Sequence, residues 1–282
     1  MHDDWKIQDL LAWTSNFFGD KGIDNPRLEA EILLARVLNR DRVYLYANFD
    51  LPVNQQEREL FRAFIKRRVQ GEPAAYIVGH KEFMSLNFKV TPDVLIPRSD
   101  TEVLVESVVA IVNRDDNLRI CDVGTGSGAI AVSLAHYLPN AIVYATDISP
   151  EALGIAQENA TNNLVDIKFF LGDLLKPLEN EKKFDILTAN LPYVSPEEFK
   201  DLDKSLRDFE PVLALLADGD GLDLYRRLIP QVYDLLTNGG YVFFEIGYKQ
   251  GQFVHEMVDT FTEVEIIKDL GGRDRVIKAR KE

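Results

Sequence analysis

The tetrapeptide Asn190-Leu191-Pro192-Tyr193 places an amide, a backbone carbonyl and an aromatic ring directly after the strand-like segment FDILTA. In open α/β sheets, ligands bind at the carboxyl ends of the strands. A planar amide or amino nitrogen is a poor nucleophile because its lone pair is delocalised. If the Asn190 side-chain oxygen and the Leu191 carbonyl held its two hydrogens, with Tyr193 stacked on the planar group, the lone pair could be directed at an electrophile. The tetrapeptide therefore predicts a catalytic and substrate-binding group for a planar nitrogen.

The same four residues could instead form a simple turn, since Asn and Pro both favour turns. The orienting role needs no side-chain base, because the nitrogen loses its proton only after it has formed the new bond and become cationic. The sequence fits this expectation. It shows no persuasive Ser/His/Asp arrangement, and its four histidines are scattered without the spacing of metal ligands. We expect no metal site.

A glycine-rich segment, Asp122-Val123-Gly124-Thr125-Gly126-Ser127-Gly128, lies between an expected strand and an expected helix. Glycines at such a turn allow a tight bend and let a ligand approach the backbone closely. We therefore expect a nucleoside cofactor to contact Gly124, Thr125, Gly126, Ser127 and Gly128. The segment also satisfies the loose dinucleotide pattern that ends in Gly or Ala, so by itself it leaves a nicotinamide or flavin cofactor open. A structural strand-to-helix turn is the simpler alternative.

Two acidic residues follow the next strands along the chain. Asp147 ends the segment AIVYATD, where a carboxylate can accept both ribose hydroxyl hydrogens. Its alternative role is to cap the following helix, which Ser149 could do equally well. Asp173, which follows the strand-like IKFFL, could accept a hydrogen from an adenine amino group, and Leu174 could cover the ring. A solvated loop aspartate is the alternative for Asp173.

Residues from about 4 to 71 have the spacing of helices and little that is typical of strands. Asn25 is suited to cap a helix that Pro26 begins. A later helix begins near Asn54 and ends at Gly71, and it is expected to bury Leu60, Phe61, Phe64, Ile65 and Val69. These segments predict a small helical bundle.

The spacing of apolar residues is no longer helical between residues 82 and 94, where a short hairpin or extended connector is expected. From residue 101, helical and strand-like segments alternate, which predicts an α/β domain with a parallel sheet and crossover helices. The last two strand-like segments, VEIIKDL and RVIKAR, are joined by Gly271-Gly272, so an antiparallel edge strand is expected. We accordingly divide the chain into a helical domain (1–80), a connector (81–100) and an α/β domain (101–282).

The bulk composition limits the classes of function. The net charge of −14 and the isoelectric point near 4.8 argue against a broad nucleic-acid-binding surface, because phosphate binding depends on clustered Lys and Arg. Cys121 is the only cysteine, so no intramolecular disulfide can form. No apolar run reaches the ~18 residues that cross a bilayer, and the acidic start MHDDWKIQDL is unlike a signal peptide. We expect a cytoplasmic protein that binds neither membranes nor, directly, nucleic acid.

Further motifs occur in an order that is similar to one known family. They are Tyr76-Ile77-Val78-Gly79, Leu95-Ile96-Pro97-Arg98-Ser99-Asp100-Thr101-Glu102, Phe209-Glu210-Pro211, Asp218-Gly219-Asp220-Gly221-Leu222 and Asp269-Leu270-Gly271-Gly272-Arg273-Asp274-Arg275. Together with the glycine-rich segment and the tetrapeptide, this series resembles the release-factor glutamine methyltransferases, the PrmC/HemK family, over nearly the whole chain. The set in this order is far more specific than any one of its members.

The resemblance implies a seven-stranded, Rossmann-like class I methyltransferase domain and a small helical N-terminal domain that helps to recognise a protein substrate. It implies an S-adenosyl-L-methionine-dependent enzyme that methylates the side-chain nitrogen (N5) of the glutamine in the Gly-Gly-Gln motif of class I peptide chain release factors. By position, Gly124 to Gly128, Asp147, Leu174 and Asn190 would contact S-adenosyl-L-methionine, and Asn190 to Tyr193 would hold the glutamine. We expect a monomer.

The connector residue Arg98 is a candidate for contact with the substrate backbone or the cofactor, with a connector salt bridge as the equal alternative. The chain also departs from the family pattern. The family usually has two prolines where this chain has Leu191-Pro192, and Pro-Asp or Pro-Glu where it has Ser99-Asp100. Leu191 supplies the backbone carbonyl but lacks the ring that fixes φ, so retained activity with slightly looser positioning is expected.

Three other functions remain open from the residues. An N6-adenine nucleic-acid methyltransferase would use the same tetrapeptide to hold an adenine amino group, although the acidic charge and the lack of a DNA-reading domain oppose it. A nicotinamide-dependent oxidoreductase would use the glycine-rich segment but would give the tetrapeptide no role. A non-catalytic binding module could keep the fold and lose turnover.

Overall fold

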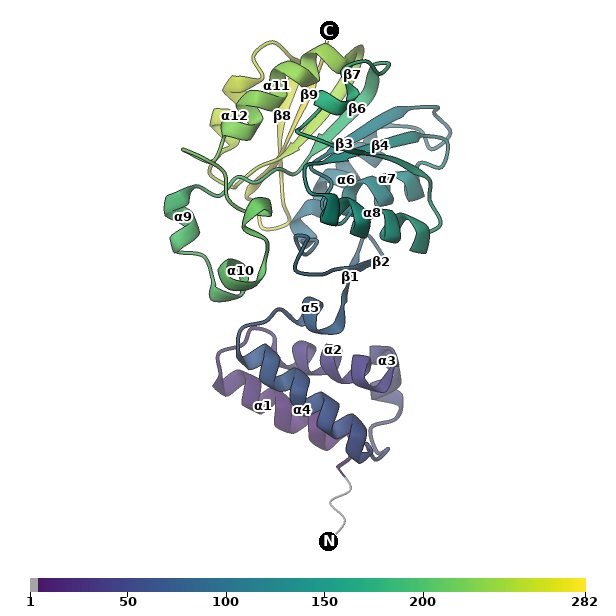
Figure 1. Cartoon of the computed structure of the whole chain (residues 1–282), viewed down its shortest axis with the longest axis vertical. Coiled ribbons are helices and arrows are strands. Elements are labelled where there is room, and N and C mark those ends of the chain that lie inside the picture. The colour runs from purple at the N-terminus through teal and green to yellow at the C-terminus, as the bar shows by residue number, and fades with distance from the viewer. Residues whose placement is uncertain (1–4) are drawn as a thin grey trace. The chain divides into compact units, whose positions relative to one another are not determined.

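The computed structural model describes residues 5–282, and the chain forms two compact units, which are described separately (Figure 1). One unit contains the described residues up to Gly79 together with Lys204–Phe209. The other contains His80–Asp203 and Glu210–Glu282. Residues 1–4 of the expected helical domain lie outside the described residues. The ranges expected from the sequence do not place Lys204–Phe209 with the helical residues.

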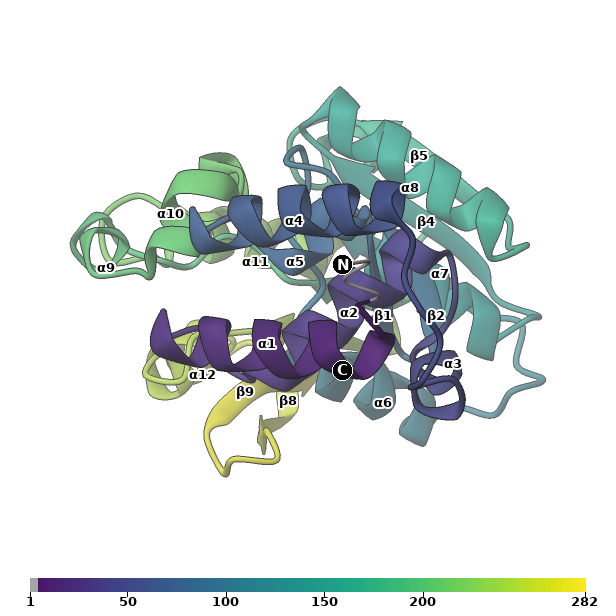
Figure 2. The same cartoon turned by 90° about the horizontal axis from the view of Figure 1, so that it is seen from below.

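The first unit is built from helices. It consists of α1 (Ile7–Asp20), α2 (Pro26–Leu38), α3 (Arg42–Ala47), α4 (Gln55–Val69), α5 (Ala74–Val78) and α10 (Lys204–Phe209). Helix α2 packs against both α1 and α4, which run along its two sides (Figure 1, Figure 2). The shared core is formed by Leu11, Phe18, Leu33, Leu34 and Phe61, all almost fully buried. The structure thus has the small helical bundle that the sequence predicts.

One helix start agrees with the sequence prediction, and two other details of these helices differ from it. Asn54 does cap α4, since its side-chain oxygen accepts a hydrogen bond from the Glu57 N–H at 2.9 Å. Asn25 makes no side-chain cap on α2, because its own backbone is left-handed, with a φ of 49°. Leu60 and Val69 of α4 are 45% and 36% exposed and were wrongly expected in the core. Phe61 takes the inward position, and a neighbouring residue on a helix points about 100° away from it.

The second unit contains a seven-stranded sheet in the order β5-β4-β3-β6-β7-β9-β8. Its strands are β3 (Arg119–Val123), β4 (Ile142–Asp147), β5 (Ile167–Leu171), β6 (Phe184–Ala189), β7 (Leu236–Glu245), β8 (Thr262–Lys268) and β9 (Asp274–Arg280). The first five of these pair in parallel, and β9 is antiparallel to both β7 and β8. The seven-stranded class I methyltransferase fold with an antiparallel C-terminal pair is thereby confirmed.

Helices cover both faces of this sheet, as Figure 1 shows. They are α6 (Ser99–Ile111), α7 (Ala129–Tyr137) and α8 (Pro150–Asn162) on one face and α11 (Asp223–Leu235) and α12 (Gly251–Met257) on the other. Neighbouring strand residues point to opposite faces. Accordingly Ile120 packs with the α6–α8 side, whereas Cys121 packs with the α11–α12 side. Burial on both faces explains why the central strands are apolar at consecutive positions.

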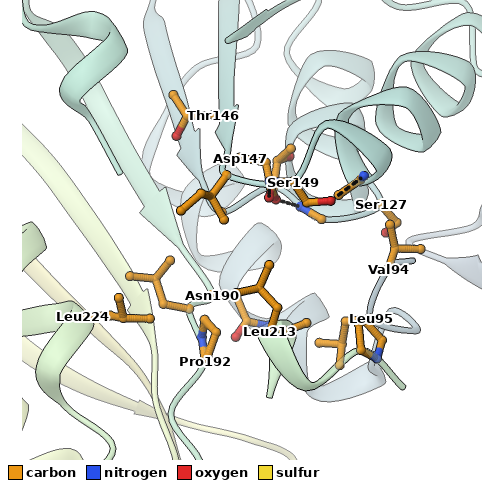
Figure 3. A pocket seen from close by; sticks show the side chains of 18 of the residues that line it. Val94, Leu95, Ser127, Thr146, Asp147, Ser149, Asn190, Pro192, Leu213 and Leu224 are labelled. Atoms are coloured by element: carbon orange, nitrogen blue, oxygen red, sulfur yellow. Dashed lines mark hydrogen bonds between the residues drawn. The ribbon is translucent and has the colours of Figure 1, made fainter. Parts of the chain in front are cut away.

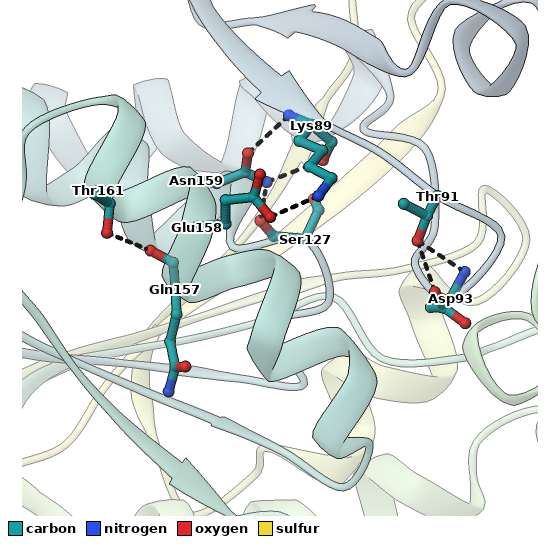
Figure 4. A network of polar contacts seen from close by, with 8 residues as sticks. All are labelled: Lys89, Thr91, Asp93, Ser127, Gln157, Glu158, Asn159 and Thr161. Atoms are coloured by element: carbon teal, nitrogen blue, oxygen red, sulfur yellow. Dashed lines mark hydrogen bonds and ion pairs between the residues drawn. The ribbon is translucent and has the colours of Figure 1, made fainter.

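A two-stranded hairpin, β1 (His80–Phe83) and β2 (Leu86–Lys89), precedes the sheet. Asn159 of α8 joins this hairpin to the glycine-rich segment (Figure 4). Its side-chain oxygen accepts from the Lys89 N–H at 2.7 Å, and its amide nitrogen donates to the carbonyls of Lys89 and Ser127 at 3.0 and 2.8 Å. Because Asn159 is fully buried, the hairpin and the glycine-rich segment are fixed to one helix.

The remaining short elements lie beside the carboxyl ends of the strands or join them. They are η1 (Lys176–Leu178), α9 (Pro196–Lys200) and η2 (Val212–Ala214). Among the described residues, no helix has the length and apolar character needed to cross a membrane.

Candidate active site

A cavity of about 660 Å³ lies at the carboxyl ends of the parallel strands, within the second unit (Figure 3). Such a volume is typical of sites for small molecules and cofactors. The site residues expected from the sequence that line it are Arg98, Gly124, Thr125, Gly126, Ser127, Asp147, Asp173, Leu174, Asn190, Leu191 and Pro192. Gly128 and Tyr193 are not part of the lining. The fold therefore brings the glycine-rich segment, both acidic loops and most of the tetrapeptide to one cavity.

The glycine-rich turn is fixed to the neighbouring strand by its own backbone. The N–H groups of Gly124 and Thr125 both donate to the Thr146 carbonyl at 2.9 Å. Gly124 has a φ of 70°, and a Cβ atom there would lie only 2.7 Å from Cδ2 of Leu191. Glycine is therefore favoured here by the left-handed backbone and by the close approach of the Leu191 side chain.

Gly128 has a role in helix packing. It precedes α7 with a φ of 81°, and a Cβ atom there would lie 3.1 Å from the Cβ of Ala156 in α8. Its lack of a side chain allows α7 and α8 to pack closely at this point. The structure thus gives Gly128 a packing function and places it outside the cavity wall.

Asp147 holds the turn from the opposite side. Its Oδ2 accepts from the Gly126 N–H at 2.7 Å, and its Oδ1 accepts from the Ser149 N–H at 2.9 Å. Burial raises the pKa of Asp147, against these backbone hydrogen bonds, which lower it. Ser149 caps α8 by accepting from the Ala152 N–H, so the capping role considered for Asp147 belongs to its neighbour. Each carboxylate oxygen retains lone pairs for a ligand in the cavity.

Asp122 was not expected in the site, and it lies directly behind the turn. It is buried, its Oδ1 accepts from the Thr188 hydroxyl at 2.8 Å, and burial raises its pKa to about 7. The Thr125 hydroxyl lies near this carboxylate and lowers its pKa, although neither Thr125 Oγ1 nor Asp122 Oδ2 reaches hydrogen-bonding geometry with a described residue. Thr146 Oγ1 is also buried without such a partner. Thr125 and Thr146 line the cavity with other atoms, since their hydroxyl oxygens are themselves buried.

Asp173 is held by cations at the cavity wall. Its carboxylate receives Lys176 Nζ at 2.7 Å and Arg227 Nη2 at 2.5 Å. The hydrogen bond from Lys176 and the nearby Arg227 lower the pKa of Asp173. It is therefore an ion-paired residue rather than a solvated loop aspartate. Leu174 is buried beside it in a left-handed conformation, with a φ of 55°, and contributes an apolar part of the wall.

The tetrapeptide continues directly from β6, and its members separate into two environments. The Asn190 side-chain nitrogen donates to Thr101 Oγ1 at 3.3 Å, and the buried Leu191 N–H donates to the Tyr225 hydroxyl at 3.4 Å. Tyr193 lies behind the cavity wall, where its carbonyl accepts from Gln250 Nε2 at 3.1 Å. Burial raises the pKa of the Tyr193 hydroxyl to about 12. The first three residues face the cavity, and the ring of Tyr193 does not line it.

Arg98 forms the salt bridge that was the alternative to substrate contact. Its guanidinium bonds Glu210, whose carboxylate also accepts from the Ile96 N–H at 3.2 Å. Glu210 is 4% exposed, so this buried carboxylate fixes the connector beside the cavity that Arg98 lines. Glu210 could have been found from the sequence, since it lies within the motif Phe209-Glu210-Pro211. The sequence offers no such signal for Tyr225 or Gln250.

Comparison with known proteins agrees with this geometry. Residues 9–79 match the family model described as PrmC N-terminal domain, and residues 114–278 match that described as methyltransferase domain. The release factor glutamine methyltransferase of Geobacter sulfurreducens is 40% identical over 98% of this chain and 97% of its own length. That of Moorella thermoacetica is 46% identical over 92% of each chain.

A solved structure shows the same fold at lower identity. The 16S rRNA N2 G1207 methyltransferase of Thermus thermophilus, in complex with AdoMet and guanosine, is 17% identical and has a TM-score of 0.54. The match covers 72% of this chain and 50% of that one, and supports the fold alone. The near full-length relatives decide the family. The chain belongs to the release factor glutamine methyltransferases.

Proposed function

We propose that this protein methylates the side-chain amide nitrogen (N5) of the glutamine in the Gly-Gly-Gln motif of class I peptide chain release factors. The observation that carries the proposal is that Asn190, Leu191 and Pro192 line the same cavity as the glycine-rich turn and Asp147. The residues proposed to bind a planar nitrogen and those proposed to bind a nucleoside therefore line one cavity. The family of the chain names the substrate as a release factor glutamine.

S-adenosyl-L-methionine is the methyl donor, and when bound it supplies an electrophilic methyl group on a sulfonium sulfur. The cavity residues fit this molecule. The Asp147 carboxylate can accept from the ribose hydroxyls, and Leu174 offers an apolar surface for the adenine. Asp173 is the proposed acceptor for the adenine amino group, with the lone pairs that its two cations leave free.

The amide nitrogen of the substrate glutamine would be bound through its two hydrogens. The Asn190 side-chain oxygen accepts one, and the Leu191 carbonyl accepts the other. Both acceptors belong to a rigid strand end rather than a free loop, since Leu191 is 4% exposed and its N–H is bonded to Tyr225. Fixed geometry of this kind can lower a barrier by roughly 7–11 kcal/mol without a side-chain base. The nitrogen releases its proton after the new bond has formed.

Tyr193 has a supporting role in this proposal. Its partly buried ring packs against the core, and its carbonyl accepts from Gln250, so both contacts hold the end of the tetrapeptide in place. Arg98, which lines the cavity, contributes by fixing the connector through Glu210. We further propose that the helical unit binds the release factor, and that the enzyme acts as a monomer in the cytoplasm without direct binding of nucleic acid.

The test is mass spectrometry of a purified release factor after incubation with the enzyme and S-adenosyl-L-methionine. Wild type should add one methyl group to the Gly-Gly-Gln glutamine, and Asn190→Ala should add almost none, while both bind the donor in calorimetry. Asp185→Asn is the control, because Asp185 accepts the Arg119 N–H at the opposite end of the strands. Label that entered only DNA in a parallel incubation would contradict the substrate assignment.

A further inference from the structure

A buried polar group lies directly behind Asn190. Thr101 of α6 is 4% exposed and lines the cavity, and Glu245 at the end of β7 is 2% exposed. Neither residue belongs to the tetrapeptide or to the glycine-rich segment. Three elements that are distant in sequence, β6, α6 and β7, therefore bring one amide, one hydroxyl and one carboxyl together.

The contact between Asn190 and Thr101 concerns the orientation of an amide. Asn190 Nδ2 donates to Thr101 Oγ1 at 3.3 Å. An asparagine side chain has a donating NH2 end and an accepting oxygen end, and a rotation of 180° exchanges them. When the NH2 end bonds Thr101, the oxygen end remains for the cavity. The opposite orientation would present two donors to a substrate amide that itself donates, and it would prevent binding.

A threonine hydroxyl cannot select between these orientations alone, because it both donates and accepts. The adjacent carboxyl of Glu245 removes the ambiguity. An ionised carboxylate only accepts, so the Thr101 hydroxyl donates to it and presents its lone pairs to Asn190. The hydrogen bond from the Thr101 hydroxyl lowers the pKa of Glu245, and Glu245 Oε2 has no hydrogen-bond partner among the described residues.

We propose that Thr101 and Glu245 are positioning residues that fix the amide of Asn190 with its oxygen toward the substrate. The catalytic consequence rests on the function proposed above, whereas the orientation itself is a property of the free enzyme. Neither residue needs to touch the substrate. Thr101 acts through Asn190, and Glu245 acts through Thr101.

This arrangement makes the orientation depend on pH. Burial raises the pKa of Glu245 to about 7, opposed by the Thr101 hydrogen bond and by the charges of Arg275 and Arg98, and assisted by Asp100. Tyr193 also faces this carboxyl, and the Tyr225 hydroxyl donates to the Glu245 backbone carbonyl. Above about pH 7 the carboxylate accepts from Thr101. Below it the neutral acid can donate to Thr101, which can then donate to Asn190 and favour the opposite orientation.

The first experiment compares Thr101→Val, which removes the hydroxyl at nearly constant shape, with Thr101→Ser, which keeps it. Loss of one hydrogen bond that fixes the acceptor should lower kcat for release-factor methylation about tenfold in Thr101→Val. The KM for S-adenosyl-L-methionine should change less than twofold, and Thr101→Ser should recover most of kcat. Ser133→Ala is the matched control, since this buried hydroxyl donates to the Ala129 carbonyl of its own helix. Equal kcat in Thr101→Val and wild type would overturn the proposal.

The second experiment uses the free enzyme and needs no methyl transfer. The side-chain NH2 signal of Asn190, assigned by its loss in Asn190→Asp, is followed by 15N NMR between pH 5.5 and 8.5. It should titrate near pH 7 in wild type and lose that titration in Glu245→Gln. A titration unchanged by Glu245→Gln would refute the role of Glu245. An inactive wild type with the expected NMR titration would refute the proposed function and leave the orientation established.

Discussion

The contact between Gly124 and Leu191 predicts that the cofactor turn and the substrate tetrapeptide are mechanically coupled. In Gly124→Ala the new Cβ would lie 2.7 Å from Leu191 Cδ2, and the backbone would keep a φ of 70°. The left-handed conformation costs a non-glycine residue about 1–2 kcal/mol. Overpacking of a buried contact costs about 1–3 kcal/mol more. We therefore expect Gly124→Ala to lower the local free energy of unfolding by about 2–5 kcal/mol.

Gly126→Ala separates the two terms. Gly126 has a similar φ of 56°, but a Cβ atom there meets nothing within 4 Å. This variant should lose only the backbone term of about 1–2 kcal/mol. In Leu191→Ala the Cδ2 atom is absent while the backbone carbonyl remains, so the combined variant Gly124→Ala, Leu191→Ala should recover the steric term. We expect a coupling energy of about 1–3 kcal/mol between the two sites.

Hydrogen exchange of the β3 and β6 amides, read by mass spectrometry, is the appropriate assay for stability. Both tryptophans, Trp5 and Trp13, belong to the helical unit, so their fluorescence does not report on the sheet. Initial rates of methylation supply the functional reading, since a displaced Leu191 moves the proposed carbonyl acceptor. Equal losses in Gly124→Ala and Gly126→Ala, with no coupling to Leu191→Ala, would refute the reasoning.

Two further variants test the electrostatics. Asp147→Asn should weaken binding of S-adenosyl-L-methionine about tenfold or more in calorimetry. The amide nitrogen that replaces one carboxylate oxygen cannot accept the N–H of Gly126 or Ser149. Unchanged affinity would argue against this carboxylate as a ligand. Glu31→Gln should lower the unfolding free energy of the helical unit by about 1–3 kcal/mol at pH 7, since its buried carboxylate binds half-exposed Arg27 and Arg42. Burial alone would raise the pKa of Glu31, but hydrogen bonds from Tyr46, Arg42 and Arg27 lower it below 4.5. A lowered folded-state pKa gives stability that is complete above pH ~4.5 and is lost below it. The difference in unfolding free energy between variant and wild type, read by tryptophan fluorescence in urea, should therefore shrink toward pH 3. A constant difference would show that packing, not charge, is responsible.

The sequence predicts most of the fold because its signals are local. Alternation of helical and strand-like segments is sufficient for the parallel sheet, and the Gly271-Gly272 turn is sufficient for the antiparallel pair β8 and β9. The residues at the carboxyl ends of strands, Asp147 and Asn190, must then meet at one edge of the sheet. Leu60 shows the limit of this reasoning, since a helical period fixes a face only to within about one residue.

The parts of the site that could not be predicted depend on contacts between distant segments. Arg98 and Glu210 are separated by 112 positions, and Asn190 and Thr101 by 89. No periodicity connects such pairs. A tyrosine after a proline gives no indication of whether its ring enters a cavity or packs behind it, and Tyr193 does the latter. Gly128 likewise fits a ligand-binding pattern while serving helix packing.

The departure at Leu191 shows how packing can replace a covalent constraint. A proline at this position would have a fixed φ but no N–H. Leucine has the N–H, and here that group donates to the Tyr225 hydroxyl, which in turn donates to the Glu245 carbonyl. The leucine side chain is buried against Gly124, so it is held from a second direction. Two contacts thus restrict a residue whose backbone would otherwise be freer than that of proline. The side chain of Leu191 packs against the glycine-rich turn, and its N–H is linked through Tyr225 to the buried end of β7. The looser positioning expected from the sequence alone is therefore opposed by a backbone hydrogen bond that proline could not make and by the packing of the leucine side chain.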